Sequence, residues 1–355
     1  MRVGFIGLGN LGVHLATSLH RNGFDLTVND IRKESAAGLI AKGVKWADTP
    51  KALAENVDIV ITCLPSPAVV KTVMLADNGV LAGLKKGGVW MEMSTNDRHV
   101  IEEIAEKAAA LGIDTLESPV TGGVHLAASG KITVLIGGDK AVYDKCIKVI
   151  EAVGAKNFYM GPLGNASIIK VITNMLAFIH LVAAGEAMML AKQGGLDLKT
   201  SFEAIKASSG TSFVHETESQ LVLSGSYNIG FTMDLALKDI GFATEMGRTF
   251  GVPLELAAIT EQAFVRGKAQ YGGDAWSPKV IKLLEDAVAA AKAAGPAEDY
   301  APLATNVSIG NWSADHVPTG PEVFSTFAPA LGDMFSRSVA DKIELFGYSE
   351  HTHET

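Results

Sequence analysis

The chain has 355 residues, of which 48% are hydrophobic and 19% charged, and its formal net charge is −9. This composition is typical of a well-packed globular protein with a large core and room for two domains, and it excludes a disordered chain. An acidic balance without a run of Lys and Arg argues against binding to nucleic acid or to an anionic membrane surface.

Cysteine usage indicates the redox compartment. The chain has two cysteines, Cys63 and Cys146, and they do not have the spacing of metal ligands. We therefore expect a reducing, cytoplasmic location and no bound metal. The N-terminus begins a core strand directly, which leaves no room for a signal peptide.

Short strands alternate with helices over the first half of the chain. Strands are predicted at 2–7, 25–30, 57–64, 89–94, 114–118 and 133–137, and helices at 10–21, 33–42, 67–75, 97–111 and 140–153. Several of these strands are apolar throughout, which is typical of parallel strands covered on both faces. The alternation predicts an α/β protein with a doubly wound sheet.

The turn between the first strand and the first helix is the strongest functional signal. It reads Gly7-Leu8-Gly9-Asn10-Leu11-Gly12, and its glycines allow a tight turn and a close backbone approach to a pyrophosphate at the helix N-terminus. Asp30 lies 18 residues after Gly12, where a carboxylate can accept hydrogen bonds from both ribose hydroxyls. This combination predicts a Rossmann-type domain that binds NAD. Because Arg32 follows closely, NADP remains possible.

The pattern becomes helical after Gly164. A long apolar helix is predicted from 165 to 193, followed by helices near 198–207, 232–250, 254–270 and 277–293. The long helix contains four polar side chains, so we expect it to be buried in the protein and not to span a membrane; they are Lys170, Asn174, His180 and Glu186.

Four parts follow from this pattern. They are a dinucleotide-binding domain at 1–163, an interdomain helix at 164–193, a helical substrate and oligomerisation domain at 194–293, and a C-terminal extension at 294–355. A cleft between the two domains is the usual place for a substrate beside a cofactor.

The extension is rich in Pro, Gly, Ser and Ala, with one amphipathic stretch at 327–346. A mobile tail and an arm that packs on a partner subunit both fit this composition. Its tryptophan and phenylalanines argue against complete disorder. His351 and His353 are interpreted as part of a solvated tail.

Lys170 and Asn174 are the best candidates for acid–base chemistry. Their i, i+4 spacing places them on one face of the long helix. Burial in apolar surroundings favours the neutral amine, which can accept the proton of an alcohol, while the asparagine orients the lysine or the substrate. A lysine that snorkels at the start of a helix is the alternative interpretation.

Other candidates lie at the ends of predicted strands. Thr121, Gly122 and Gly123 follow the fifth strand, where a hydroxyl and two amides can hold a carboxylate, although a plain strand-ending turn fits equally. Leu64-Pro65 and Ser94-Thr95 end strands three and four and should border the dinucleotide.

Lys238 and Asp239 lie on a predicted helix of the second domain. A charged pair of this kind is usually a solvated face. A second amine close to Lys170 would, however, lower the pKa of that lysine further.

These segments together resemble the β-hydroxyacid dehydrogenase family, which includes 3-hydroxyisobutyrate dehydrogenase and tartronate semialdehyde reductase. The resemblance covers roughly residues 1–293 and rests on six segments in order, namely 5–12, 64–65, 94–95, 119–123, 161–174 and 231–239.

The resemblance implies a Rossmann domain followed by an all-helical domain like that of 6-phosphogluconate dehydrogenase. It implies reversible, metal-free oxidation of a 3-hydroxy acid by NAD(P), in dimers or tetramers. It gives Lys170 the role of acid/base assisted by Asn174, and Thr121–Gly123 the role of substrate binding. It places Lys238 beside the cofactor, together with Gly7–Gly12, Asp30, Leu64, Pro65 and Thr95.

Three features depart from the family pattern. Position 121 is threonine where many members have serine, and residues 96–98 lack a proline that is common nearby. Arg98 and His125 are therefore candidates for altered substrate recognition, beside plain surface roles. The extension beyond 293 is not usual for the family.

Three other functions compete with a dehydrogenase. Related imine reductases and chromatin-associated relatives without catalytic activity lack the lysine that matches Lys170, and the chromatin-associated ones carry reader modules. A structural oligomer with a vestigial cofactor site would not need the complete set of site residues. The presence of Lys170 favours the lysine-dependent dehydrogenase.

Overall fold

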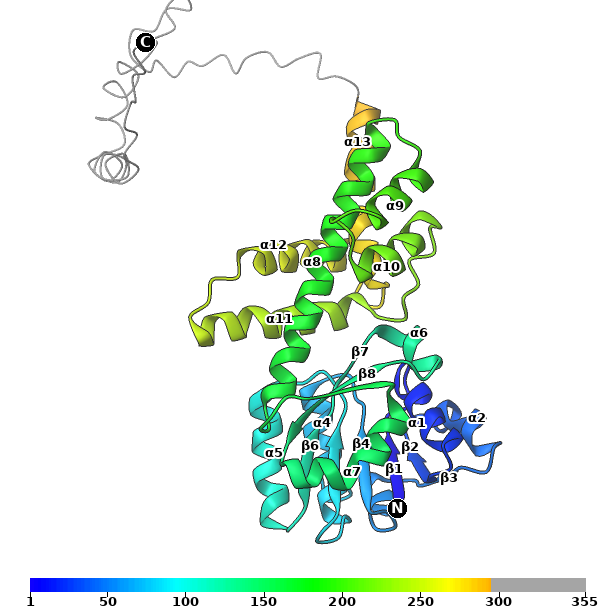
Figure 1. Cartoon of the computed structure of the whole chain (residues 1–355), viewed down its shortest axis with the longest axis vertical. Helices are drawn as coiled ribbons and strands as arrows, with labels where there is room; N and C mark the ends of the chain where they lie inside the picture. The colour runs from blue at the N-terminus through cyan, green and yellow to red at the C-terminus, as the bar shows by residue number, and fades with distance from the viewer. Residues whose placement is uncertain (295–355) are drawn as a thin grey trace, which may run out of the picture. The chain divides into compact units, whose positions relative to one another are not determined.

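A nine-stranded sheet occupies the N-terminal half of the computed structural model, which describes residues 1–294 (Figure 1). Its strands are β1 (Arg2–Ile6), β2 (Asp25–Asn29), β3 (Lys45–Trp46), β4 (Ile59–Thr62), β5 (Val89–Glu92), β6 (Asp114–Glu117), β7 (Val120–Thr121), β8 (Thr133–Gly138) and β9 (Lys156–Tyr159). Their order is β3-β2-β1-β4-β5-β6-β8-β7, with β9 paired to β8. Strands β3, β2, β1, β4, β5 and β6 run parallel to one another. The direction in which successive strands are added to the sheet reverses between β1 and β4. The predicted doubly wound Rossmann arrangement is therefore confirmed.

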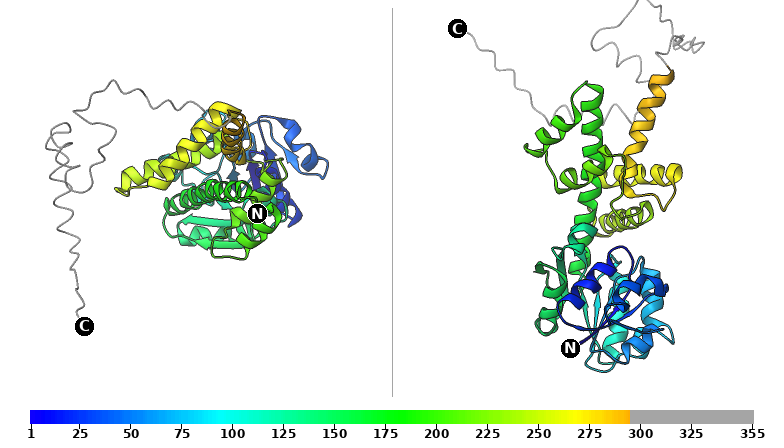
Figure 2. Two further views of the ribbon diagram at one scale, coloured as in Figure 1. Left: turned by 90° about the horizontal axis from the view of Figure 1, so that it is seen from above. Right: turned by 90° about the vertical axis from the view of Figure 1, so that its right-hand side faces the viewer.

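Helices cover both faces of the sheet (Figure 2). They are α1 (Gly12–Arg21), α2 (Ala37–Ile40), α3 (Pro50–Ala54), α4 (Pro67–Leu75), α5 (Arg98–Ala110), α6 (Gly123–Ala128) and α7 (Lys140–Val153), with 3-10 turns at Lys33–Ala36 and Val80–Ala82. Because side chains alternate along a strand, the sheet supports two hydrophobic cores. One joins Phe5 and Ile61 to α1 and α7, and the other joins Val60 and Trp90 to α3, α4 and α5.

The edge of the sheet beyond β6 differs from the prediction of a parallel sheet. Strand β8 runs antiparallel to both β6 and β7, and parallel only to β9. Between β6 and β8 the chain forms only β7 and the six-residue α6, so no long helix carries it across the sheet. An antiparallel neighbour does not require such a crossover, whereas a parallel one does.

The second half of the described chain is helical, as predicted. Its helices are α8 (Asn165–Gln193), α9 (Leu198–Lys206), α10 (Phe213–Leu223), α11 (Met233–Phe250), α12 (Glu255–Tyr271) and α13 (Lys282–Ala294), with a 3-10 turn η3 at Ser277–Ile281. Helix α8 contacts α9, α10, α11 and α12, and it also contacts β8 of the sheet. The core of these helices includes Phe178, Met233 and Phe264. Residues 1–293 therefore form one compact unit.

Helix α8 is only partly buried, contrary to the prediction of a buried helix. Ile172, Leu176 and Leu190 are 36%, 44% and 75% exposed, while Lys170 and Phe178 face the interior. By length and composition, α8 is the one helix among residues 1–294 that could cross a membrane. Dimers or tetramers through this helical region remain a prediction. The stretch 327–346, His351 and His353 lie outside the described residues.

Candidate active site

The Gly-rich turn has the geometry of a dinucleotide site. Gly7 has a φ of +98°, and a Cβ on Gly12 would lie 2.0 Å from the Gly7 carbonyl oxygen, so the turn tolerates no side chain at either position. A Cβ on Gly9 would instead meet no atom within 4 Å, which leaves open space against the backbone for a ligand. Helix α1 begins after Leu11 without a side-chain cap or an acidic residue in its first turn. The turn and the helix N-terminus therefore fit a pyrophosphate.

Asp30 holds the end of β2 against this turn. One of its carboxylate oxygens accepts a hydrogen bond of 2.7 Å from the Leu8 N–H, and the other accepts one of 2.8 Å from the Arg32 N–H. A carboxylate has about four acceptor positions, so two remain for ribose hydroxyls. The predicted ribose contact is therefore compatible with the structure and stays a prediction.

The ends of β4 and β5 are joined to each other and to the helical half of the chain. The Leu64 N–H donates to Ser94 Oγ at 2.7 Å. Lys238 Nζ, from α11, donates to the Thr95 carbonyl oxygen at 3.0 Å. A second link runs from Asn10 Nδ2 to the Gly230 carbonyl oxygen at 3.1 Å. Residues predicted to border the cofactor thus meet the segment before α11 and the helix itself.

Lys170 and Asn174 begin a chain of hydrogen bonds that ends at Thr95. Lys170 Nζ donates to Asn174 Oδ1 at 2.7 Å, as the i, i+4 spacing predicts. Asn174 Nδ2 donates to Asp239 Oδ2 at 2.6 Å, and Lys238 Nζ donates to Asp239 Oδ1 at 2.5 Å. The lysine on α8 is therefore connected through two residues of α11 to Thr95, which follows β5. We call this carboxyl end of β4 and β5, with Leu64 and Thr95, the cofactor edge of the sheet.

The environment of Lys170 prepares it for proton transfer. Burial lowers the pKa of Lys170 to about 8 from its usual 10.5, while the Asp239 carboxylate raises this pKa and the Lys238 ammonium lowers it. A lysine with a pKa near the working pH can both accept and return a proton. The snorkelling interpretation is wrong, because Lys170 is only 7% exposed.

Thr121, Gly122 and Gly123 form the junction between β7 and α6. Gly122 and Gly123 have φ values of +122° and +82°, which only glycine adopts easily. The segment lies near the helix of Lys170, because β7 contacts α8. Val124, which follows it, lies against Gly230, since a Cβ on Gly230 would be 3.3 Å from Val124 Cγ2.

Arg98 and His125 have different settings. Arg98 Nε donates to Glu102 Oε1 at 2.7 Å on α5, in a partly exposed ion pair. The His125 ring is exposed and stacks on Phe213 at 6.0 Å between ring centroids. Neither arrangement identifies a contact to substrate, so both roles stay predictions.

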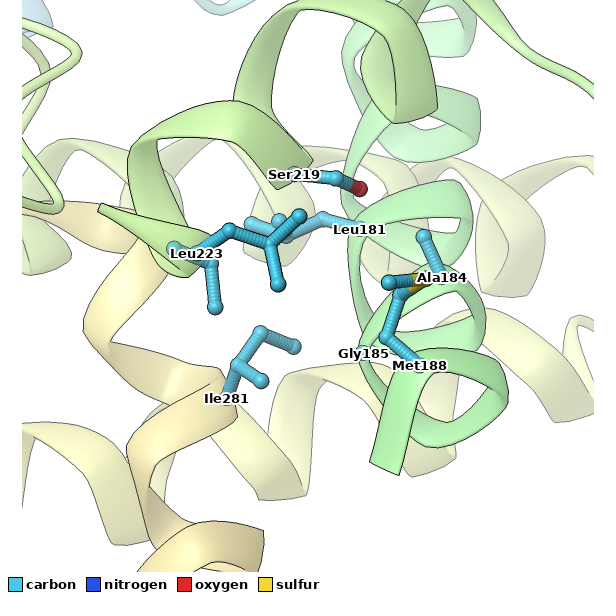
Figure 3. Close-up of a pocket in the computed structure, with 8 residues that line it drawn as sticks. Leu181, Ala184, Gly185, Met188, Ser219, Leu223 and Ile281 are labelled. Carbon is cyan, nitrogen blue, oxygen red and sulfur yellow. The ribbon is translucent and has the colours of Figure 1, made fainter. Parts of the chain in front are cut away.

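A small cavity of the described chain lies away from these residues. It has about 20 Å³, room for one water molecule, and Figure 3 shows that its lining from α8, α10 and η3 is apolar except for Ser219. A second, open groove of about 250 Å³ lies between α8, α12, η3 and α13. Neither is lined by a predicted site residue. Among residues 1–294, no group of three His, Cys, Asp or Glu side chains could hold a metal ion.

Three buried carboxylates near the site were not predicted. Asp239 was interpreted with Lys238 as a possible solvated pair, yet its side chain is 1% exposed. Glu92 and Glu117 are fully buried at the last positions of β5 and β6. A charged residue that ends an apolar strand is a signal that could have identified Glu92, whereas β6 reads Asp-Thr-Leu-Glu and gives no such signal for Glu117.

Comparisons with known proteins agree with this geometry. Residues 2–161 match a family model described as the NAD binding domain of 6-phosphogluconate dehydrogenase. Residues 164–284 match one described as the NAD-binding domain of NADP-dependent 3-hydroxyisobutyrate dehydrogenase. The two models cover the sheet and most of the helical half, so this chain binds NAD(P).

Individual relatives extend over most of the described chain. A 2-(hydroxymethyl)glutarate dehydrogenase of Eubacterium barkeri is 33% identical over 286 residues, covering 80% of this chain and 95% of that protein. The mitochondrial 3-hydroxyisobutyrate dehydrogenase of Mus musculus is 32% identical and covers 74% and 80%. The crystal structure of 3-hydroxyisobutyrate dehydrogenase from Salmonella typhimurium is 30% identical, covers 80% and 99%, and has a TM-score of 0.75.

Two further relatives have other names. The nuclear factor N-PAC of Homo sapiens is 28% identical, and this chain spans 48% of its length. An imine reductase of Streptomyces aurantiacus, 21% identical with a TM-score of 0.52, shares the fold alone. The dehydrogenases above match at higher identity and over most of their length. The chain therefore belongs to the β-hydroxyacid dehydrogenase family, and it is an NAD(P)-dependent 3-hydroxyacid dehydrogenase.

Proposed function

We propose that this enzyme reversibly oxidises a small 3-hydroxy acid, similar to 3-hydroxyisobutyrate, to the semialdehyde or keto acid, with NAD as the preferred cofactor. The observation that carries the proposal is the buried Lys170, which is hydrogen-bonded to the neutral Asn174 and linked through α11 to Thr95. The names of the relatives from Eubacterium barkeri and Mus musculus support this substrate class.

Lys170 acts in this proposal as the general base of oxidation and the general acid of reduction. Its neutral amine accepts the substrate hydroxyl proton, and in the reverse direction its ammonium returns that proton. When bound, the nicotinamide supplies the acceptor for the hydride. Asn174 keeps the amine in place through its Oδ1, and Asp239 orients Asn174 by accepting from its Nδ2.

The substrate carboxylate is assigned to Thr121, Gly122 and Gly123. The positive φ values of Gly122 and Gly123 turn successive backbone N–H groups in a way that suits an anion, and Thr121 adds a hydroxyl donor. A carboxylate held there would leave the 3-hydroxyl free to reach the amine on α8. Relative to serine, the threonine adds a methyl group beside this anion site.

A substrate panel tests the proposal. NADH formation would be measured at alkaline pH with 3-hydroxyisobutyrate, 2-(hydroxymethyl)glutarate, 3-hydroxypropanoate, glycerate, serine, threonate and a sulfonate analogue. We expect strong turnover of one 3-hydroxy acid, also by the control variant Lys192→Ala at the exposed end of α8. Tight NADH binding without turnover of any of these compounds would contradict the proposal.

Asp30→Arg tests the cofactor preference. The Asp30 carboxylate repels the 2′-phosphate of NADP, and an arginine would attract it. We expect kcat/KM to favour NAD at least about tenfold in the unmodified enzyme, and the preference to move towards NADP by at least about tenfold in the variant. Asp25→Arg, at the opposite end of β2, makes the same charge change and should leave the preference unaltered. Equal efficiencies with both cofactors would refute the preference.

A further inference from the structure

Helix α8 begins without a capping side chain of its own. Its N-cap residue is Gly164, which has a φ of +94° and makes no side-chain hydrogen bond. A Cβ at this position would lie 2.7 Å from Arg98 Nε, so a larger capping residue would not fit without rearrangement. The first N–H groups of a helix need acceptors when they are buried. Those of α8 must therefore find acceptors elsewhere in the chain.

Glu117 supplies these acceptors from the last position of β6. Its carboxylate accepts hydrogen bonds from the Ala166 N–H at 2.7 Å, the Ser167 N–H at 3.2 Å and the Ser167 hydroxyl at 2.5 Å. Three donors on two oxygens suit a carboxylate, which has no hydrogen to place among them. Glu117 is fully buried, and its contacts cross about fifty residues of sequence.

The neighbouring strand leaves room for this carboxylate. Gly137 of β8 pairs directly with Glu117, and a Cβ on Gly137 would lie 2.3 Å from Glu117 Oε1. The carboxylate thus occupies the volume that a side chain on β8 would take. The Glu117 carboxylate therefore packs between β8 and the first turn of α8.

Lys170 follows Ser167 by three residues, less than one helical turn. Its hydrogen bond to Asn174 lies within α8, so it fixes the amine relative to the helix and not to the sheet. The charged groups that face the amine are Asp239 and Lys238, both on α11. Two connections therefore set the amine relative to the sheet. One runs through α11 to the Thr95 carbonyl oxygen, and the other is the direct contact of the first turn of α8 with β6.

We propose that Glu117 is a positioning residue that anchors the first turn of α8 on the sheet and thereby fixes the Lys170 amine against the cofactor edge. This proposal rests on the assignment of Lys170 as the acid/base. In this proposal two sets of residues have different roles. Asn174 and Asp239, on α8 and α11, orient the amine, while Glu117 fixes the position of the first turn of α8 relative to the end of β6.

Glu117→Gln and Ser167→Ala test the proposal. The glutamine amide would turn N–H groups towards N–H donors, so the first turn of α8 should loosen and admit water to Lys170. We expect kcat for alcohol oxidation to fall at least about tenfold, with the Kd for NADH within about twofold. The midpoint of the pH profile should move to higher pH, because hydration restores the pKa of Lys170 towards its usual value. Ser167→Ala removes one of three contacts and should change both quantities less, in the same direction.

Asp139→Ala is the matched control. Asp139 caps α7 by accepting hydrogen bonds from the Ala141 and Val142 N–H groups, and α7 carries no predicted site residue. This variant should lower Tm while leaving kcat and the pH midpoint unchanged. A loss of kcat in Glu117→Gln without a shift of the pH midpoint would overturn the positioning role, as would unchanged kinetics in Ser167→Ala if Glu117→Gln does not fold.

A readout without substrate separates this proposal from the proposed function. The pH dependence of acetylation of Lys170 by acetic anhydride, followed by mass spectrometry of the NADH complex, reports the pKa of its amine directly. We expect a higher midpoint in Glu117→Gln and Ser167→Ala than in the unmodified enzyme and in Asp139→Ala. If the unmodified enzyme and the three variants had the same midpoint of acetylation, the positioning role of Glu117 would be refuted, even if no substrate were turned over.

Discussion

The two lysines of the site, Lys170 on α8 and Lys238 on α11, have the same chemistry but different surroundings. Lys170 is 7% exposed and donates to the neutral amide of Asn174. The Lys238 side chain is 18% exposed and is held as an ion pair with Asp239 while it donates to the Thr95 carbonyl oxygen. One amine is arranged to exchange a proton, and the other to tie α11 to the cofactor edge.

Asp239 accounts for the different surroundings of Lys170 and Lys238. One of its oxygens accepts from Lys238 and the other from Asn174, so Asp239 is hydrogen-bonded to Lys170 only through the Asn174 amide, although its charge still raises the pKa of Lys170. A direct ion pair would favour the ammonium form of Lys170 strongly. Placing Asn174 between the two keeps the amine oriented while burial lowers its pKa.

Replacement of Lys170 should produce the largest effect. Lys170→Ala removes the general base, so kcat should fall by about 10² to 10⁴ while NADH still binds. Steady-state kinetics and fluorescence titration of NADH check this result. Lys238→Ala leaves the base in place and should lose less. A greater loss in Lys238→Ala would reverse the roles assigned to the two lysines.

Changing the two charges of α11 should move the pH profile in opposite directions. Alcohol oxidation rises with pH as Lys170 loses its proton. Asp239→Asn removes a charge that raises the pKa of Lys170, so the profile should move to lower pH. Lys238→Met removes a charge that lowers this pKa, so the profile should move to higher pH.

The two variants also differ in expected rate. Asp239→Asn should cost about tenfold in the plateau kcat, because a hydrogen bond to a charged acceptor is lost at Asn174. Profiles of kcat against pH from 6 to 10 for both variants check the pair. If both pH profiles moved in the same direction, the charges of Asp239 and Lys238 would not be what sets the pKa of Lys170.

The sequence predicted the long elements well and the short ones poorly. Helix α8 was predicted with both ends correct, because its apolar pattern is long and stops at Gly194-Gly195. Strands of two residues, such as β7, are too short to show a period. Helix α10 was missed because Ser and Gly residues before Phe213 resemble a loop, although Ser212 is in fact its N-cap.

The site was predictable where the relevant residues are close in sequence. The contact of Lys170 with Asn174 follows from helical spacing alone. The partner of Asn174 is Asp239, 65 positions later, and only the packing of α11 on α8 brings the two together. The same limit applies to Glu117, whose function at the start of α8 depends on the meeting of a strand end and a helix N-terminus.

The last effect is on stability and not on rate, and it concerns Glu92, a second acid near Lys238. Burial raises the pKa of Glu92 to about 7 from 4.5, against hydrogen bonds from Ser94 and Thr62 and the attraction of Lys238. A carboxyl group with a raised pKa in the folded state contributes stability below pH 4.5 that is lost as the pH rises through 7. The shift corresponds to at most about 3 kcal/mol over this window.

Glu92→Gln tests this contribution. Glutamine does not titrate, so the free energy of unfolding of the variant should improve relative to the unmodified enzyme as the pH rises from 5 to 8. Urea unfolding at several pH values measures this difference, and all other titrating groups cancel in it. The lost acceptor for the Ser94 N–H or the Thr62 hydroxyl adds only a constant offset. If the difference in free energy of unfolding did not vary with pH, Glu92 would be ionised over the whole range. Lys238 would then lie near two carboxylates, Glu92 and Asp239, whereas Lys170 lies near Asp239 alone.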